Sequence, residues 1–225
     1  MAVESAYTRL VKKENEIIRL FDPPFDHSAL DPGYIKGYLP GVRENGGQYT
    51  HAAIWLIIAA AAQHNRERTY ELIRMINPLN HGSTAEEIKK YKIEPYVIAA
   101  DVYAVENHMG RGGWTWYTGS AGWMYQLLIE FFFGLKRNGN KLTFESCFPV
   151  HWSAFTIAYQ YGETVYQLNF DQQEIWDKTT VLVDEAMQED NTVFLVNDGE
   201  THQVSIRLPL AIGKTLKSLP ETVKV

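Results

Sequence analysis

Hydrophobic positions recur at helical spacing as far as residue 135. A long apolar run is typical of a helix buried on all sides, whereas one apolar face indicates a surface helix. Residues 52–62 form such an apolar run, and residues 66–76 are amphipathic. Inner and outer helices in alternation favour helical hairpins arranged in a barrel or a layered array. The pattern predicts helices at residues 5–20, 48–63, 66–76, after Ser83-Thr84, and at 94–104 and 120–135.

After Asn138-Gly139-Asn140 the periodicity becomes that of strands. Short segments alternate or run apolar, and Gly, Asn and Asp separate them, which is typical of an all-β module. These segments are LTFESCF, AFTIAYQYG, ETVYQLNFD, TTVLVD, NTVFLVNDG and HQVSIRLPL. The predicted fold class is therefore α+β, with a helical domain at 1–137 and an antiparallel β-sandwich at 138–225.

Composition and charge exclude several classes of function. The chain has 225 residues and a net charge of −6, without a Lys/Arg cluster, so we expect no nucleic-acid partner. The apolar run 52–62 is shorter than the roughly 20 residues that cross a bilayer, so we expect no membrane span. The charged N-terminus lacks a secretory signal and Cys147 is the only cysteine, so we expect a cytoplasmic location.

The stretch RGGWTWYTGSAGW at 111–123 interleaves Trp114, Trp116 and Trp123 with four glycines. Aromatic faces suit the C–H faces of a sugar or a base, and glycine lets the backbone approach a ligand. Thr118-Gly119-Ser120 lies where a helix is expected to begin, so its N–H groups would face a phosphate or a carboxylate. The alternative is a tight loop capped by Thr118 or Ser120, with the tryptophans in the core.

A second candidate site is GVRENGGQYTHAAIW at 41–55. Arg43 and Glu44 lie in a glycine-bracketed loop, and Thr50 and His51 lie on the first turn of the apolar helix. Ionisable groups beside an apolar helix need partners or a ligand, and these groups suit a hydroxyl-rich or phosphorylated substrate. The alternative is a helix cap made by Gln48 or Thr50, with His51 as a satisfied core histidine.

The preceding Pro- and Gly-rich loop, residues 22–47, is long enough to suggest a functional segment. Its acids Asp22, Asp26 and Asp31 are compatible with carboxylate catalysis, but turn roles explain them at least as well.

Metal and nucleophile chemistry find little support. The seven histidines form no ligand spacing, so we expect no metal site. Cys147 and His151 lie four apart in a strand-rich region, which favours a buried thiol over a nucleophile–base pair.

Four segments together closely resemble the C-terminal part of family 94 inverting glycoside phosphorylases, which include cellobiose and chitobiose phosphorylases and the C-terminal region of cyclic β-1,2-glucan synthases. They are DPGYIKGYLPGVRENGGQYTHAAIW (31–55), EPYVIAADVYAV (94–105), GRGGWTWYTGSAGWMYQLLIE (110–130) and FPVHWSAFTIAYQYGETVYQL (148–168). The resemblance covers nearly the whole chain. It implies the C-terminal portion of an (α/α)6 barrel followed by a jelly-roll sandwich.

The implied reaction is phosphorolysis of a β-glucosidic bond to α-glucose 1-phosphate with inversion. Inorganic phosphate is the co-substrate, and no cofactor is implied. By position in the motifs, His51, Thr118 and Gly119 would bind phosphate. Glu44 would hydrogen-bond the sugar, with Arg43 and Gln48 as supporting neighbours.

In one respect the chain departs from this family. The family's general acid, an aspartate of the barrel, precedes every segment that matches here, so no catalytic residue is assigned. Loss of proton donation slows cleavage by about 10²–10⁴-fold. We therefore expect a fragment that is inactive alone and needs the N-terminal half of the barrel as its partner.

Several alternatives stay open. A non-catalytic carbohydrate- or phosphate-binding module is one, and a helical scaffold used only for association is another. Homodimerisation, the acceptor sugar and the separate roles of the three tryptophans are also open.

Overall fold

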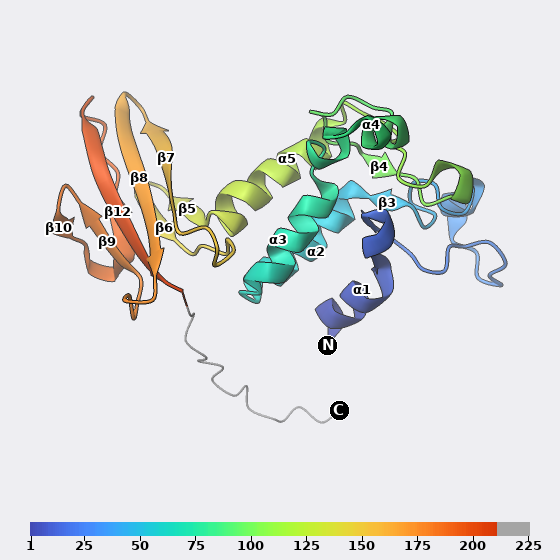
Figure 1. Cartoon of the computed structure of the whole chain (residues 1–225), viewed down its shortest axis with the longest axis horizontal. Coiled ribbons are helices and arrows are strands. Elements are labelled where there is room, and N and C mark those ends of the chain that lie inside the picture. The colour runs from blue at the N-terminus through green and yellow to red at the C-terminus, as the bar shows by residue number, and fades with distance from the viewer. Residues whose placement is uncertain (211–225) are drawn as a thin grey trace. The chain divides into compact units, whose positions relative to one another are not determined.

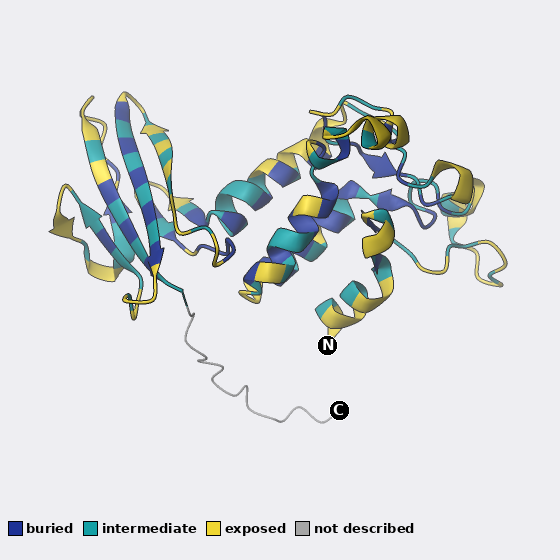
Figure 2. Cartoon of the chain, viewed as in Figure 1, coloured by how far each residue is buried: buried dark blue, intermediate teal, exposed yellow. Residues whose placement is uncertain are grey.

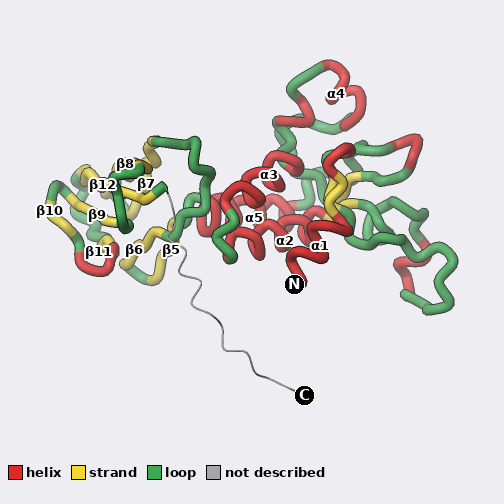
Figure 3. Tube along the Cα trace, turned by 60° about the horizontal axis from the view of Figure 1, so that its bottom comes forward, coloured by secondary structure: helices red, strands yellow, loops and turns green. Residues whose placement is uncertain are grey.

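The computed structural model describes residues 1–210, which fall into two compact units (Figure 1). The first unit comprises Met1–Lys136 and Phe144–Pro149, and the second comprises Arg137–Thr143 and the residues from Val150 on. Helices and longer strands lie in different stretches of the chain (Figure 3), so the fold is α+β. No helix within residues 1–210 is long and apolar enough to cross a membrane.

Five helices build the first unit. They are α1 (Ala2–Leu10), α2 (Thr50–Ala62), α3 (Arg66–Ile76), α4 (Ala85–Tyr91) and α5 (Thr118–Gln126), which continues as a π-helix over Leu127–Phe132. Side-chain caps begin two of them: Asn65 accepts from Arg68 N at 3.2 Å, and Thr84 accepts from Glu87 N at 3.2 Å. Helix α2 packs against both α3 and α5 and is the inner helix of the unit.

One predicted helix is shorter than expected, and another is wrong. The first ends at Leu10, and the chain then forms an antiparallel pair of β1 (Val11–Lys12) and β2 (Ile17–Ile18), joined by the 3₁₀ turn Lys13–Asn15. Glu16, at φ 55°, lies in the left-handed region that a helix cannot contain, which ends the helical path here.

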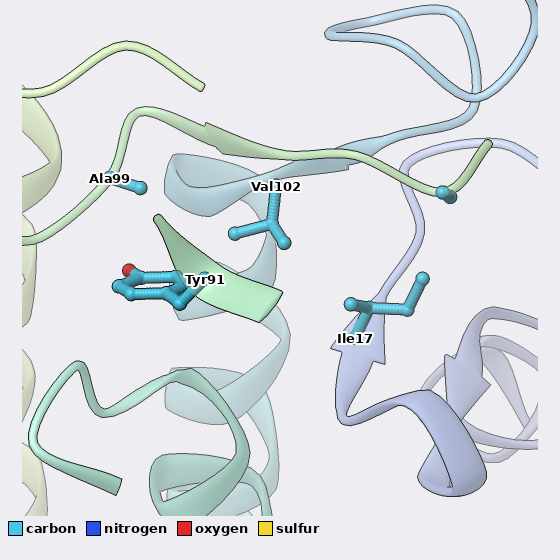
Figure 4. Packing of buried hydrophobic residues seen from close by; sticks show 5 residues of the cluster. Ile17, Tyr91, Ala99 and Val102 are labelled. Carbon is cyan, nitrogen blue, oxygen red and sulfur yellow. The ribbon is translucent and has the colours of Figure 1, made fainter. Parts of the chain in front are cut away.

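The predicted helix at 94–104 is an irregular segment that contains β4 (Asp101–Val102). Apart from Val97 N, which donates to Glu94 O at 3.1 Å, its backbone groups bond mainly to other segments: Ala104 N donates to Gly41 O and Tyr103 N to Arg111 O, at 2.7 and 2.8 Å. Its Ala99, Val102 and Ala104 join Ile17 and Tyr91 in a buried apolar cluster (Figure 4). Tertiary packing therefore overrides the local helical pattern.

The second unit is built of strands in two sheets. A five-stranded sheet has the order β10 (Ala186–Met187), β9 (Thr180–Val183), β12 (Thr201–Pro209), β8 (Thr164–Gln173) and β7 (Ala154–Tyr161). A three-stranded sheet has the order β11 (Thr192–Phe194), β6 (Lys141–Phe144) and β5 (Leu135–Asn138). Every second residue of β8 from Thr164 to Gln172 is buried, as its banding in Figure 2 shows. This period of two is what the sequence predicts for a half-buried strand.

The five-stranded sheet is mixed and not wholly antiparallel, which corrects the prediction. Strand β12 runs parallel to β8, with Val204 opposite Leu168, while β7 and β9 pair antiparallel. The connection from β8 to β12 passes through β9, β10 and β11, and it is long enough to return the chain in the same direction.

Candidate functional site

Three segments far apart in the sequence meet at β4. On one side, β3 (Gln48–Tyr49) pairs antiparallel with β4, with Tyr49 opposite Asp101. On the other side, Ala100 N donates to Trp114 O at 2.7 Å, and Val102 forms an isolated bridge with Gly112. The segments 41–55, 94–105 and 110–123 are therefore joined by backbone hydrogen bonds.

The loop that carries Arg43 and Glu44 is held by Asn45, which is completely buried. The Asn45 side chain accepts from Phe25 N at 2.7 Å and donates to Phe25 O and Tyr38 O at 3.1 and 2.8 Å. At Gly41 a side chain would lie 2.7 Å from Ala104 O, so only glycine allows this close approach to the 94–105 segment. The long Pro- and Gly-rich loop is thus fixed at its C-terminal end.

His51 and Gly119 lie against each other. A Cβ atom added to Gly119 would lie 2.8 Å from His51 Cε1 and 3.1 Å from His51 Nε2. His51 is half-buried on the first turn of α2, and Thr118 and Gly119 are exposed on the first turn of α5. The structure therefore brings the three residues predicted to bind phosphate to one place.

The first turn of α5 has no side-chain cap. The residue before the helix is Tyr117, and Ser120 Oγ donates to Tyr117 O at 3.3 Å. The alternative interpretation, a loop capped by Thr118 or Ser120, is therefore wrong. An uncapped first turn keeps backbone N–H groups available for an anion.

Arg43 and Glu44 form the other half of the site. The Arg43 Nε and Glu44 Oε2 atoms are 3.5 Å apart, and the two side chains are only 17% and 15% exposed. The guanidinium of Arg43 lies over the Trp114 ring at 3.9 Å and near the Tyr38 ring at 5.2 Å. Both Arg43 Nε and Glu44 Oε2 are buried without a hydrogen-bond partner among the described residues, so this pair keeps donor and acceptor capacity unused.

Gln48 and Thr50 do not cap α2, which corrects the alternative interpretation of the loop. Gln48 is 2% exposed and its Oε1 accepts from Ile18 N at 2.9 Å. Thr50 Oγ1 is buried without a partner in the part of the chain that the structure describes. Gln48 therefore ties β3 to β2 from beneath the loop.

Aromatic rings surround these groups. His51 stacks on Tyr49 with centroids 5.7 Å apart and meets the edge of Trp55 at 6.2 Å. Trp55 in turn meets Trp123 at 5.6 Å. Trp114 is 47% exposed and Trp116 is 68% exposed. These two are therefore not core residues, which contradicts the alternative interpretation that placed the tryptophans in the core. They present apolar faces to solvent beside the polar groups.

Asp101 is a site residue that the sequence analysis missed. It is 2% exposed on β4, and its Oδ1 accepts from Trp114 N at 3.1 Å. Burial raises the pKa of Asp101, and the hydrogen bond from Trp114 and the charge of Arg43 oppose this shift. The sequence did hold a clue to its importance: Asp101 is the only acid in the otherwise apolar run VIAADVYAV, and a buried charge needs partners.

The remaining candidates have structural surroundings. Cys147 is buried, its Sγ lies 3.7 Å from Thr69 Oγ1, and burial raises the pKa of its thiol, which confirms the interpretation as a buried thiol. Asp22 pairs with Lys12 at 2.6 Å and Arg19 at 3.0 Å, and Asp31 accepts from Gly33 N. The Asp31 contact is the expected turn role, whereas Asp22 is held by two ion pairs. Within residues 1–210, no group of three or more His, Cys, Asp or Glu side chains is arranged to hold a metal ion.

Comparison with known proteins shows the family. The model of the glycosyl hydrolase 94 superfamily, catalytic domain, matches residues 1–134, and the chain belongs to this superfamily. It is 41% identical over 186 residues to a cyclic beta-(1,2)-glucan synthase of Rhizobium meliloti, covering 83% of this chain and 7% of that protein.

Two other relatives are phosphorylases. The chain is 27% identical over 154 residues to an N,N'-diacetylchitobiose phosphorylase of Vibrio furnissii, covering 68% of this chain and 19% of the relative. It is 24% identical over 189 residues to a solabiose phosphorylase of Paenibacillus borealis, covering 82% and 24%. The chain therefore spans less than a quarter of the length of these three relatives.

Proposed function

We propose that the chain supplies the phosphate seat and part of the sugar site of an inverting glycoside phosphorylase. The reaction converts a β-glucoside or β-glucan and inorganic phosphate into α-glucose 1-phosphate and the released acceptor sugar. Its phosphorylase relatives support the reaction type. The observation that carries the proposal is the contact between His51 and Gly119, which places an imidazole against the open N-terminus of α5.

The phosphate seat combines two kinds of donor. Backbone N–H groups of Thr118 and Gly119 point along the positive end of α5, and the His51 ring adds a side-chain donor. Such a seat fixes a phosphate oxygen for attack on the anomeric carbon from the face opposite the leaving group. Fixing the nucleophile in this way is a large share of the catalysis that the protein has to provide.

The sugar side is formed by Arg43 and Glu44 with the exposed face of Trp114. Glu44 Oε2 and Arg43 Nε form an ion pair at 3.5 Å, but neither atom has a hydrogen-bond partner among residues 1–210, which suits hydroxyl groups of a sugar. Gln48 supports this loop from below through its bond to Ile18. We propose that glucose binds beside the stack of Arg43 on Trp114, against the part of the indole that stays exposed.

In this proposal the general acid comes from another segment of polypeptide. Asp22 and Asp31 have structural partners, and Asp101 is buried behind Trp114. Helix α2 also leaves Trp55 53% exposed, an apolar surface that the rest of an (α/α)6 barrel would cover. The helical unit is then the C-terminal portion of that barrel, and the strand unit is its sandwich, divided near residue 138.

We further propose that the chain acts in the cytoplasm, where its buried thiol stays reduced. Phosphate is the co-substrate in this reaction, and the proposal includes no cofactor. Sedimentation of the purified chain tests whether a second copy of the chain covers Trp55.

Calorimetry of inorganic phosphate with the purified chain tests the seat. His51→Ala is expected to weaken binding by about tenfold or more, the loss of one charge-assisted hydrogen bond. His27→Ala is the control, because the His27 side chain is 93% exposed on the Pro- and Gly-rich loop. Equal binding by wild type and His51→Ala would contradict the proposal.

A second measurement tests the missing acid. The chain alone, given phosphate with cellobiose or β-1,2-glucan, is expected to release no glucose 1-phosphate. Release of this product would overturn the need for an external acid. Tight sugar binding that ignores phosphate and His51 would instead favour a non-catalytic carbohydrate-binding module.

A further inference from the structure

Asp101 stands between the two loops that carry the sugar side of the site. It lies on β4, with Tyr49 of β3 as its register partner and the 110–114 segment bonded to its other side. Its side chain is buried, although a carboxylate in such a place loses its hydration. Because burying this carboxylate is unfavourable, we look for the interactions that it makes.

The contacts of Asp101 with the 113–114 backbone are close. Its main-chain oxygen accepts from Gly113 N at 2.8 Å, and its Oδ1 accepts from Trp114 N at 3.1 Å. A Cβ atom on Gly113 would lie 2.4 Å from Oδ1 and 2.5 Å from Oδ2, so the carboxylate occupies the space that a side chain at 113 would need. This arrangement fixes where the backbone carries the Trp114 ring.

The charge of Asp101 acts on the other loop. Its Oδ2 is buried without a hydrogen-bond partner among the described residues, and so is Arg43 Nε. The charged groups that act on Asp101 are Arg43, which attracts the carboxylate, and Glu44, which repels it. The guanidinium carbon of Arg43 in turn lies over the Trp114 ring, 3.9 Å from its centroid. One carboxylate thus accepts from the Trp114 backbone and attracts by its charge the arginine whose guanidinium lies on the same indole.

We propose that Asp101 is a positioning residue that sets the stack of Arg43 on Trp114 and so shapes the sugar side of the site. Its relevance for a sugar rests on the proposed function, whereas its effect on the stack does not. The phosphate seat is held separately, by the contact of His51 with Gly119. Disturbing Asp101 therefore changes the sugar side and leaves the phosphate side intact.

Nuclear magnetic resonance of the wild-type chain tests the stack without any ligand. The Trp114 backbone amide and the Arg43 Nε–Hε signals are expected to titrate together, with a midpoint above 3.8, the ordinary pKa of an aspartate. In Asp101→Asn both signals are expected to shift and to lose this titration. Asp31→Asn is the matched control, because Asp31 also accepts from a backbone N–H, of Gly33, on an exposed loop.

Gly113→Ala disturbs the same carboxylate from the other side while its charge remains. It is expected to move the Trp114 and Arg43 signals as Asp101→Asn does, and Gly122→Ala, which meets nothing within 4 Å, is expected to leave them unchanged. Unchanged signals in Asp101→Asn would overturn the proposal. If that variant does not fold, the titration of the wild-type chain decides, and independent midpoints for the two signals overturn it.

Binding separates this inference from the proposed function. Asp101→Asn is expected to weaken glucose 1-phosphate by about tenfold and to leave inorganic phosphate unchanged. A wild-type chain that binds neither ligand contradicts the proposed function, while the resonance experiment still decides the role of Asp101. Equal affinity of Asp101→Asn and wild type for glucose 1-phosphate overturns the positioning role.

Discussion

The edge of the His51 ring occupies the space that a side chain at Gly119 would fill, 2.8 Å from an added Cβ atom. The two residues are 68 positions apart in the sequence and meet because α2 packs against α5. A glycine at this position is therefore required by a histidine on another helix, in addition to any requirement of the helix itself. This contact allows a direct comparison of two glycines on α5.

Gly119→Ala is expected to displace the imidazole and to weaken phosphate binding by about tenfold. Gly122→Ala lies one turn further along α5 and meets nothing within 4 Å, so it is expected to leave binding unchanged. Both changes replace glycine by a better helix former, and Gly122→Ala should stabilise the chain by about 0.5–1 kcal/mol. Calorimetry and thermal unfolding measure the two effects. Equal phosphate affinity of the two variants would show that the ring does not take part in the seat.

Arg43→Lys tests the planar stack on Trp114. Lysine keeps the positive charge beside Glu44 and Asp101 but has no flat face and no fork of donors. We expect glucose 1-phosphate to bind about tenfold more weakly, with little change for inorganic phosphate. Arg68→Lys is the control, because Arg68 lies over the Tyr7 ring at 3.9 Å, outside the candidate site. If Arg43→Lys binds glucose 1-phosphate as tightly as wild type, Arg43 contributes to this binding only through its charge.

The helices that are apolar or capped could be predicted from the sequence, but the pairs of two-residue strands between them could not. Helix α3 has the predicted bounds, and Thr84 caps α4 as expected. The segments 11–18 and 94–104 were predicted as helix, because their apolar residues also fit that period. Their strands are two residues long and depend on partners elsewhere in the chain, so no local signal exists for them.

Part of the candidate site could be predicted from the sequence alone. His51, Thr118 and Gly119 lie in distinctive segments, and the structure places His51 against Gly119. Asp101 could not be placed, because its role depends on which backbone faces its carboxylate, and that follows from the pairing of β3 with β4. The parallel pairing of β12 with β8 was missed because strand direction is set by the connections and not by alternation.

Thr164→Val is expected to destabilise the strand unit. Thr164 is completely buried, and its Oγ1 accepts from Asp198 N at 2.8 Å and Gly199 N at 2.9 Å while donating to Asp198 Oδ1 at 2.9 Å. Valine keeps the shape but leaves these groups unpaired, which costs about 2–3 kcal/mol. Thr156→Val is the matched control: Thr156 is exposed on β7 with one bond to Asn169, and we expect a loss within about 0.5 kcal/mol. Urea unfolding measures both free energies, and equal losses would contradict the assignment.

His202 makes the stability of the strand unit depend on pH. Its Nδ1 lies 2.6 Å from Asp184 Oδ2 and its Nε2 lies 3.1 Å from Asp198 Oδ2. The hydrogen bond to Asp184 is the main cause that raises the pKa of His202, and His202 in turn helps to lower the pKa of both acids. A raised histidine pKa gives stability that is fully present below the unfolded value of 6.5 and is lost as the pH rises through the folded value.

Asp184 and Asp198 also make the stability depend on pH in the acid range, where their contribution is lost as the pH falls instead of as it rises. Because the pKa values of Asp184 and Asp198 are lowered from 3.8, their contribution is present above that pH and is lost as the pH falls through their folded values. His202→Gln is therefore expected to lower the melting temperature by about 3–6 °C at pH 5.5 and by less at pH 8.5. His108→Gln, at an exposed position of the helical unit, is the control. Scanning calorimetry across this range measures the difference, and a deficit in His202→Gln that does not shrink as the pH rises would show that the ion pairs do not contribute.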